Sequence, residues 1–324
     1  MLAVKVCYPK DMTMKFITKT AIAAAASALC GTSALAYDFG NGLSLVGSVE
    51  LEYVDYTGSS ESFVFSDVTL SWRSQAGGAI GFGFDLSLDD VRSLDGGSDN
   101  NIWASLVVTT GNGEFAIGRP RPVLDGMFVV PAVGGVDIYD LEVFGLFSGS
   151  YVASAALMSD ADIVGMTYKG SAGALSYGVG LHHLSDGPMD ADAFEAGLTY
   201  TMGSAQVFAA YESLDAPGPV SLDKVQIGAR YDAANWSVGV LVSDLESGPF
   251  KGFSSNLFGD YQINDALSVG VQVTKFGGTI FGDETLIGLT GTYSSAMGAF
   301  AELGVITDSD MSDEVFSASV GYEF

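Results

Sequence analysis

The sequence predicts an all-β fold, an antiparallel up-and-down barrel of about sixteen strands that crosses a membrane, and three observations lead to it. From residue 37 onward, apolar and polar residues alternate with a period of two, which is typical of a strand with one apolar face. Short and long connections alternate between these stretches, and no stretch keeps a helical period. Only 16% of the residues are charged, whereas soluble domains usually have about 25%.

Residues 1–36 are expected to form a secretory signal peptide that is removed. A basic stretch around Lys15 precedes an apolar run over residues 21–30, and Ala34 and Ala36, two small residues around Leu35, end the segment, which is the order found in such peptides. The run is too short to span a membrane as a helix. We therefore expect a single pore-forming domain over residues 37–324. Residues 1–11 precede Met14, and we expect that they reflect a start codon placed too far upstream.

The remaining domain is a polyanion without cysteine. Both cysteines, Cys7 and Cys30, lie in the predicted leader, so no disulfide, thiol nucleophile or cysteine metal site is expected. Four of the 13 Lys and Arg residues and one of the 39 acids also lie there, which leaves 9 basic and 38 acidic residues. A nucleic-acid-binding protein would carry the opposite sign of charge, so that class is excluded.

The individual strands follow from the alternation. In residues 79–89, for example, Ile80, Phe82 and Phe84 share one face, and Asp85 and Asp89 lie on the other. The apolar face of each strand is expected to meet lipid. The predicted strands are near 43–57, 62–75, 79–93, 101–111, 113–121, 161–170, 173–184, 193–202, 205–214, 223–233, 236–245, 251–263, 267–278, 284–294, 299–309 and 314–324.

The connections favour a closed membrane barrel. Short turns such as GNG alternate with longer, often acidic segments such as TDSDMSDE, and residues 122–160 form a much longer connection. Outer-membrane barrels have this layout, with an even number of strands, and closure leaves no unpaired edge in the bilayer. A secreted β-sandwich is the alternative, but it explains only the alternation of polarity. A sixteen-stranded barrel is too wide for side chains to fill, so we expect an aqueous lumen.

Two stretches carry a resemblance to a known family. GEFAIGRPRPVLDGM (113–127) and PAVGGVDIYDLEVFG (131–145) are similar to the fifth strand and third external loop of the trimeric general diffusion porins of Gram-negative outer membranes. In that family the loop contains PEFGG followed by acids, folds into the barrel and places carboxylates opposite arginines of the wall. The resemblance implies a homotrimeric channel for small hydrophilic solutes.

The resemblance also implies which charges narrow the pore. Arg119 matches the family's wall arginine, whereas Arg73 and Arg230 are assigned to the lumen because they share faces with polar residues. Ala132 replaces the glutamate of PEFGG, and Leu146 stands where an arginine often follows the loop. The expected constriction therefore comprises the acids Asp125, Asp137, Asp140 and Glu142 and the bases Arg73, Arg119, Arg121 and Arg230, with Arg92 as a further candidate.

The C-terminal stretch EVFSASVGYEF resembles an assembly signal. Its alternate positions include Phe316, Val320, Tyr322 and Phe324, and aromatic residues form girdles at the membrane interfaces of such barrels. These four residues resemble the pattern by which the barrel-insertion machinery recognises outer-membrane proteins. That machinery is therefore an expected partner.

No enzyme or cofactor is expected. His182 and His183 are adjacent on a predicted strand, so they point to opposite faces, and neither is expected to serve a catalytic serine. Two acidic clusters could bind Ca²⁺ through oxygen ligands, although they lack the EF-hand spacing; solvated loops are the alternative. These clusters are Asp186, Asp190 and Asp192, and Asp308, Asp310 and Asp313.

Three functions fit the predicted barrel. The first is a passive channel that weakly favours cations. The second is a structural or adhesive surface barrel with a plugged pore. The third, a substrate-specific channel, would need a track of aromatic or basic residues along the lumen. Aromatic residues such as Phe82, Phe84 and Tyr322 instead fall on the lipid-facing positions, which favours the first.

Overall fold

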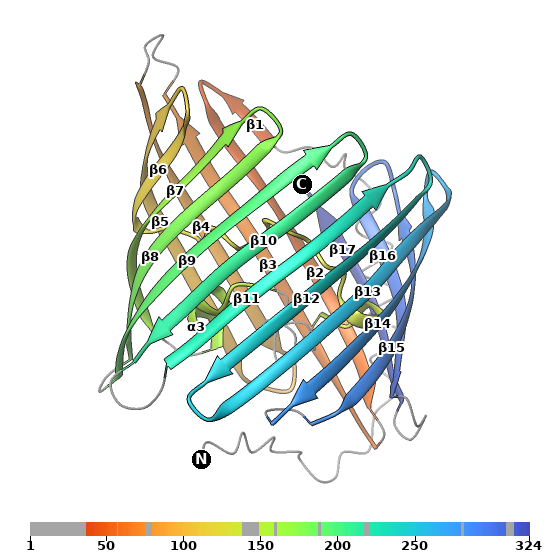
Figure 1. The fold of residues 1–324 in the computed structure, drawn as a ribbon. Coiled ribbons are helices and arrows are strands. Elements are labelled where there is room, and N and C mark those ends of the chain that lie inside the picture. Colours follow the sequence, from red (N-terminus) through yellow and green to blue (C-terminus); the bar gives the residue numbers. More distant parts are fainter. Residues whose placement is uncertain are drawn as a thin grey trace.

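The structure, a computed structural model, is a closed barrel of sixteen long antiparallel strands (Figure 1). It describes residues 37–56, 58–74, 80–137, 149–158, 161–186, 189–216, 221–279, 282–308 and 314–324. Among these residues, no helix is long and apolar enough to span a bilayer.

Each predicted strand is present, with ends that differ from the prediction by a few residues. The strands are β2 (Leu43–Tyr56), β3 (Ser59–Arg73), β4 (Ile80–Ser93), β5 (Ser98–Thr110), β6 (Gly113–Arg119), β7 (Asp162–Ala172), β8 (Leu175–Asp186), β9 (Met189–Met202), β10 (Ala205–Asp215), β11 (Ser221–Asp232), β12 (Trp236–Ser247), β13 (Phe250–Asn264), β14 (Leu267–Gly278), β15 (Glu284–Ser294), β16 (Ala299–Asp308) and β17 (Glu314–Glu323).

The last strand closes the barrel on β2. Neighbouring strands pair in sequence order, and β17 pairs with β2 from Phe316 opposite Asp55 onward. Phe324 continues this line, because it exchanges backbone hydrogen bonds of 2.8 and 2.9 Å with Gly47. A short strand that the sequence did not predict, β1 (Tyr37–Gly40), pairs with the first residues of β2. It lies at the same end of the barrel as the C-terminus (Figure 1).

Several connections are shorter than predicted, because the strands continue past the expected ends. The segment 184–193 was expected to be a loop, but β8 runs to Asp186 and β9 begins at Met189. Side chains facing each other across these strands support the extension. Ser185 donates a hydrogen bond of 3.0 Å to Asp190, and His183 lies 2.8 Å from Asp192. Polar residues that the sequence assigned to a loop therefore lie in strands.

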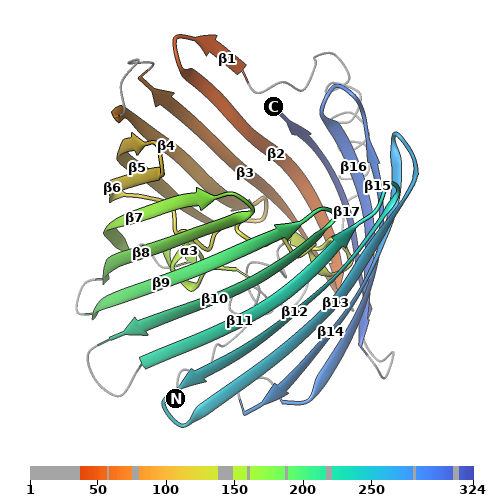
Figure 2. The same ribbon diagram turned by 45° about the horizontal axis from the view of Figure 1, so that its top comes forward.

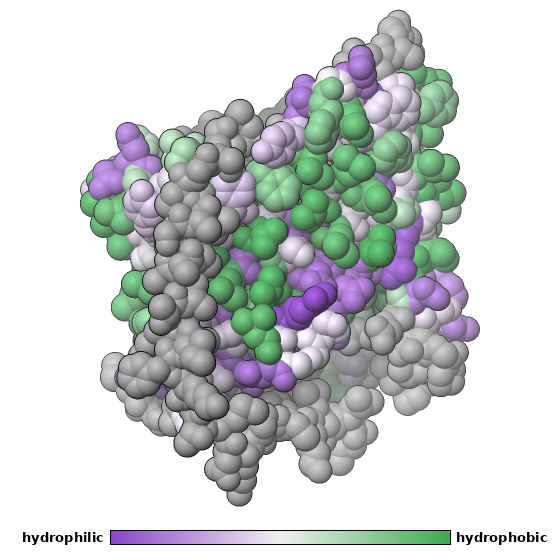
Figure 3. Space-filling model, turned by 180° about the vertical axis from the view of Figure 1, so that it is seen from behind, coloured by the Kyte–Doolittle hydropathy of each residue, from purple (hydrophilic) through white to green (hydrophobic). Residues whose placement is uncertain are grey.

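The outer wall is apolar, as the alternation predicts. On β12, Val238, Val240 and Val242 are exposed, whereas Gly239 and Leu241 between them are buried. Figure 3 shows hydrophobic residues gathered over the rear wall of the barrel. In a closed sheet that satisfies its own backbone hydrogen bonds, such a surface is suited to lipid.

The connection between β6 and β7 enters the barrel. We call its described residues, 120–137, 149–158 and 161, the inner loop. It contains the short 3₁₀-helix η1 (Val133–Gly135) and the helix α3 (Tyr151–Met158). η1 lies against β14, β15 and β16, and α3 against β5. Figure 2 shows the loop and α3 within the ring of strands.

Two apolar clusters hold the inner loop against the wall. Phe128 stacks on Phe208 of β10, with ring centroids 5.1 Å apart, and also contacts Phe258 of β13. Val133 and Val152 belong to the second cluster. Beneath the loop, the lumen wall carries apolar residues such as Phe208 and Phe258 beside its polar ones, because the wall meets protein there.

Candidate pore constriction

The open passage lies on one side of the lumen. Two cavities, of about 500 and 210 Å³, are both lined by Glu114 and Lys169 and are enclosed by β3–β10 and the first limb of the inner loop, residues 120–127. On the opposite wall, the residues that lie at the level of the loop are buried, among them Gln226, Asn256 and Thr274. We take these two cavities, which lie along β3–β10 beside the described part of the inner loop, as the passage.

The start of the inner loop follows from local sequence. Gly118 has a φ of +124°, a conformation that residues with a Cβ rarely adopt. Pro120 and Pro122 follow, and because proline lacks a backbone N–H, neither can donate to a sheet. Strand β6 therefore ends at Arg119, and the chain turns into the lumen with Arg121 between the prolines.

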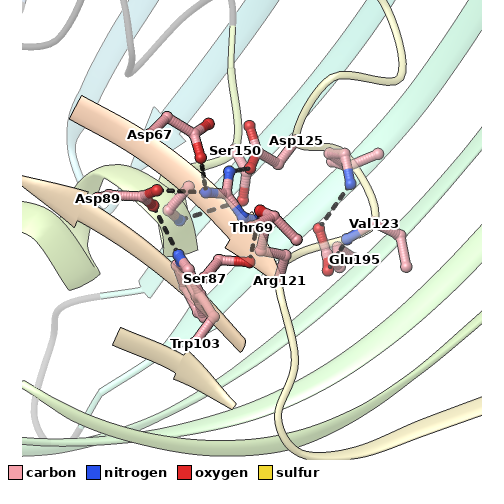
Figure 4. Close-up of polar contacts among 12 residues, drawn as sticks. Asp67, Thr69, Ser87, Asp89, Trp103, Arg121, Val123, Asp125, Ser150 and Glu195 are labelled. Carbon is pink, nitrogen blue, oxygen red and sulfur yellow. Dashed lines mark hydrogen bonds and ion pairs between the residues drawn. The ribbon is translucent and has the colours of Figure 1, made fainter. Parts of the chain in front are cut away.

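Arg121, which lines the smaller cavity, is the centre of a group of charged side chains (Figure 4). Its guanidinium forms ion pairs with Asp67 of β3 at 2.5 Å, with Asp89 of β4 and with Asp125 of the loop at 3.1 Å. Burial lowers the pKa of Arg121, but Asp89, Asp125 and Asp67 outweigh this effect and raise the pKa above its ordinary value. The arginine therefore stays charged, and three carboxylates surround one base.

Neighbouring side chains fix the wall side of this group. Trp103 of β5 donates its indole N–H to Asp89 at 2.7 Å, and Thr69 donates to Ser87 at 2.8 Å. A tryptophan has few rotatable bonds, so a hydrogen bond from a buried indole restrains the carboxylate efficiently.

A second base, Arg73, lies in the same passage. It is 2.7 Å from Asp85 and 2.8 Å from Glu114, and Ser71 also donates to Asp85. One base again meets two acids. Lys169 lies opposite Glu114 in the pairing of β6 with β7.

The charges of the passage sum to a negative value. The cavities are lined by three bases and three acids, and Asp67 and Asp89, both bound to Arg121, bring the acids to five. The formal charge of the group is therefore −2. Its members are Arg73, Arg121, Lys169, Asp67, Asp85, Asp89, Glu114 and Asp125.

The other predicted bases lie away from these cavities. Arg119 donates to Asn101 at 2.5 Å and to the Ala161 carbonyl at 3.1 Å. Arg230 is 2.7 Å from Asp232 on its own strand, and Arg92 is 3.5 Å from Asp90. None of the three arginines lines either cavity.

The predicted acids occupy different places. Asp125 lies beside Arg121 on the same limb of the loop, and not across the pore from it. Asp137 meets the β2 wall, where its backbone N–H donates to Glu52 at 3.0 Å. Burial raises the pKa of the Asp137 carboxyl, and a hydrogen bond with Glu50 opposes part of that rise. Asp140 and Glu142 lie outside the described residues.

Three fully buried wall glutamates bind the inner loop, and the sequence did not single them out. Each accepts hydrogen bonds from backbone N–H groups of the loop. Glu52 of β2 binds Asp137; Glu195 of β9 binds Val123 and Leu124; and Glu212 of β10 binds Tyr151 and Val152, as well as the Ser150 hydroxyl and Lys224. In the sequence they appear only as acids on the polar faces of predicted strands, like Asp85 and Asp89 of the passage.

The geometry defines a class of protein, an outer-membrane barrel whose lumen holds an inner loop beside an open, charged passage. The chain belongs to the Gram-negative porin family, whose model matches residues 18–323. It is therefore a porin of the outer membrane that crosses the bilayer with sixteen strands. The predictions of family, barrel and location are confirmed.

Solved structures support the fold. A variant of the Rh. blastica porin shares 19% sequence identity, covers 87% of this chain and 100% of its own, and superposes with a TM-score of 0.66. A triple mutant of the Rhodopseudomonas blastica porin shares 17% identity with the same coverage and a TM-score of 0.64. No curated protein matches the sequence significantly.

Proposed function

We propose that this porin is a passive diffusion channel for small hydrophilic solutes that favours cations. The observation that carries the proposal is the formal charge of −2 in the passage, in which two bases each meet more than one carboxylate. A negative lumen raises the local concentration of cations and lowers that of anions. Residues 37–324 contain 38 acidic and 9 basic residues, and this excess of negative charge extends the preference for cations to the pore mouths.

The preference should depend on salt. Exposed charges are screened within about 8 Å at physiological ionic strength, and the charges of the passage line open cavities. We therefore expect a moderate preference for K⁺ over Cl⁻ that fades as the salt concentration rises.

Reversal potentials across planar bilayers test this function. Purified protein should form steps of conductance, and a KCl gradient should give a potential of the sign that K⁺ permeation produces. A closed barrel without conductance would support the structural or adhesive role instead. A preference for Cl⁻ would refute the charge assignment.

We also infer a homotrimer, from the resemblance to trimeric porins. Light scattering in mild detergent measures the mass of the assembly, and a monomer would contradict the inference. Ca²⁺ binding at the acidic strand ends remains a proposal on sequence grounds. Asp190 and Asp192 bind Ser185 and His183 there, and within the described part of the chain no group of acids and histidines is arranged to hold a metal.

A further inference from the structure

Glu195 is the strongest polar anchor of the first limb of the inner loop. Its Oε1 accepts from the Val123 N–H at 2.6 Å, and its Oε2 accepts from the Leu124 N–H at 3.1 Å. The His182 Nε2 lies 2.9 Å from the same Oε1. Figure 4 shows this carboxylate beside the Arg121 group.

The surroundings of Glu195 require a carboxylate. Its side chain and that of His182 are fully buried. The His182 Nδ1 has no hydrogen-bond partner within the described residues. A neutral imidazole with its proton on Nε2 therefore suits the site, because it donates to Glu195 and leaves no buried N–H unpaired. Glu195 then faces three hydrogen-bond donors. Only a carboxylate, which accepts at both of its oxygens, can pair with all three.

The residues that Glu195 holds lie between two charges of the passage. Val123 and Leu124 lie between Arg121 and Asp125 in the chain, and both are buried. Arg121 is also held by the wall acids, whereas the only ion pair that Asp125 forms among the described residues is with Arg121. The place of Asp125 therefore depends mainly on how its own limb is fixed.

We propose that Glu195 is a positioning residue that sets the ion selectivity of the pore by fixing the segment 121–125. The inference rests on the proposed channel function. Glu195 itself lines neither cavity, so it acts through Asp125 and Arg121 and not by contact with the ions.

A second wall glutamate provides a matched comparison. Glu212 is equally buried and also accepts backbone hydrogen bonds from the loop, but it binds residues 150–152 at the other limb. That limb carries none of the charges of the passage. Loss of Glu212 should loosen the loop without moving Asp125.

The test uses Glu195→Asp and Glu195→Gln in the full-length protein. Glu195→Asp keeps the charge but shortens the side chain by one methylene, so it cannot reach both N–H groups. Glu195→Gln keeps the length but places a donor against donors. In both, Asp125 is free to leave the passage, and the K⁺/Cl⁻ permeability ratio at 0.1 M salt should fall about fivefold, which is the order expected when one charge moves from about 4 to 8 Å from the ion path and acts with opposite sign on K⁺ and Cl⁻.

The outcomes separate positioning from stability and from function. Glu212→Gln, which removes one buried carboxylate, should lower the temperature of barrel unfolding with a smaller change in the ratio. A Glu195→Asp protein that unfolds earlier but keeps the wild-type ratio would overturn the proposal. If wild type shows no cation preference, yet Glu195→Asp still shifts the ratio, the proposed function fails and the positioning role stands.

Discussion

Replacement of Arg121 by glutamine should increase the preference for cations. The change leaves Asp67, Asp89 and Asp125 without their shared base, so the formal charge of the passage falls by one. Asp125, which the change leaves without its ion pair, lines the larger cavity of about 500 Å³. A sphere of that volume has a radius of about 5 Å, which sets the scale of the distance between this charge and a passing ion.

The magnitude follows from this distance. One unit charge at about 5 Å changes the energy of an ion by ~0.8 kcal/mol in bulk water, and screening in 0.1 M salt reduces this to ~0.5 kcal/mol. The effect has opposite signs for K⁺ and Cl⁻. The permeability ratio should therefore rise about fivefold in Arg121→Gln.

Reversal potentials in a KCl gradient measure the change, and Arg121→Lys is the control. Lysine keeps the charge, so its ratio should stay much closer to that of wild type, although it cannot bind several carboxylates in a planar fork. An unchanged ratio in Arg121→Gln, or a shift toward Cl⁻, would refute the placement of this group on the ion path.

Three further predictions follow from the fold. Deletion of Phe324 should leave unassembled, protease-sensitive chain in the periplasm, while Glu323→Gln assembles normally; a truncated protein that reaches the outer membrane in normal yield would exclude the assembly signal. Phe128→Ala should destabilise the docked loop by about 3–5 kcal/mol because it removes a buried aromatic ring, and increased current noise with earlier heat unfolding checks this. Burial raises the pKa of Asp137 above its ordinary value of 3.8, so its contribution to stability is greatest at low pH and is lost as pH rises through the raised pKa. Asp137→Asn should therefore raise the unfolding temperature near pH 7 more than near pH 4. Equal increases at the two pH values would contradict a raised pKa of Asp137.

The strands could be predicted because their signal is local. A membrane barrel must present apolar residues to lipid at every second position, so residues such as Val238, Val240 and Val242 identify a strand without knowledge of its neighbours. The prediction was weaker at strand ends, where pairs such as Ser185 and Asp190 extend the sheet with polar residues.

The arrangement inside the barrel could be predicted only in part. Arg121 and Asp125 were found by resemblance, but their mutual ion pair depends on how the loop folds back. Asp67 and Asp89 come from two different strands, and only the register of β3 with β4 brings them opposite each other. The anchors Glu52, Glu195 and Glu212 have the same sequence signature as any acid on a lumen-facing position, because their partners are distant backbone groups.

Thiol modification of a single cysteine tests most directly whether ions pass between the inner loop and β3–β10. Both native cysteines lie before the predicted cleavage site, so Thr201→Cys would carry the only thiol of the processed chain. Thr201 is exposed and lines the larger cavity, whereas Asn256 is buried on the opposite wall. A charged thiol reagent should reduce the current through Thr201→Cys in discrete steps and leave that through Asn256→Cys unchanged. Block of Asn256→Cys without block of Thr201→Cys would place the passage on the other side of the loop and contradict this account.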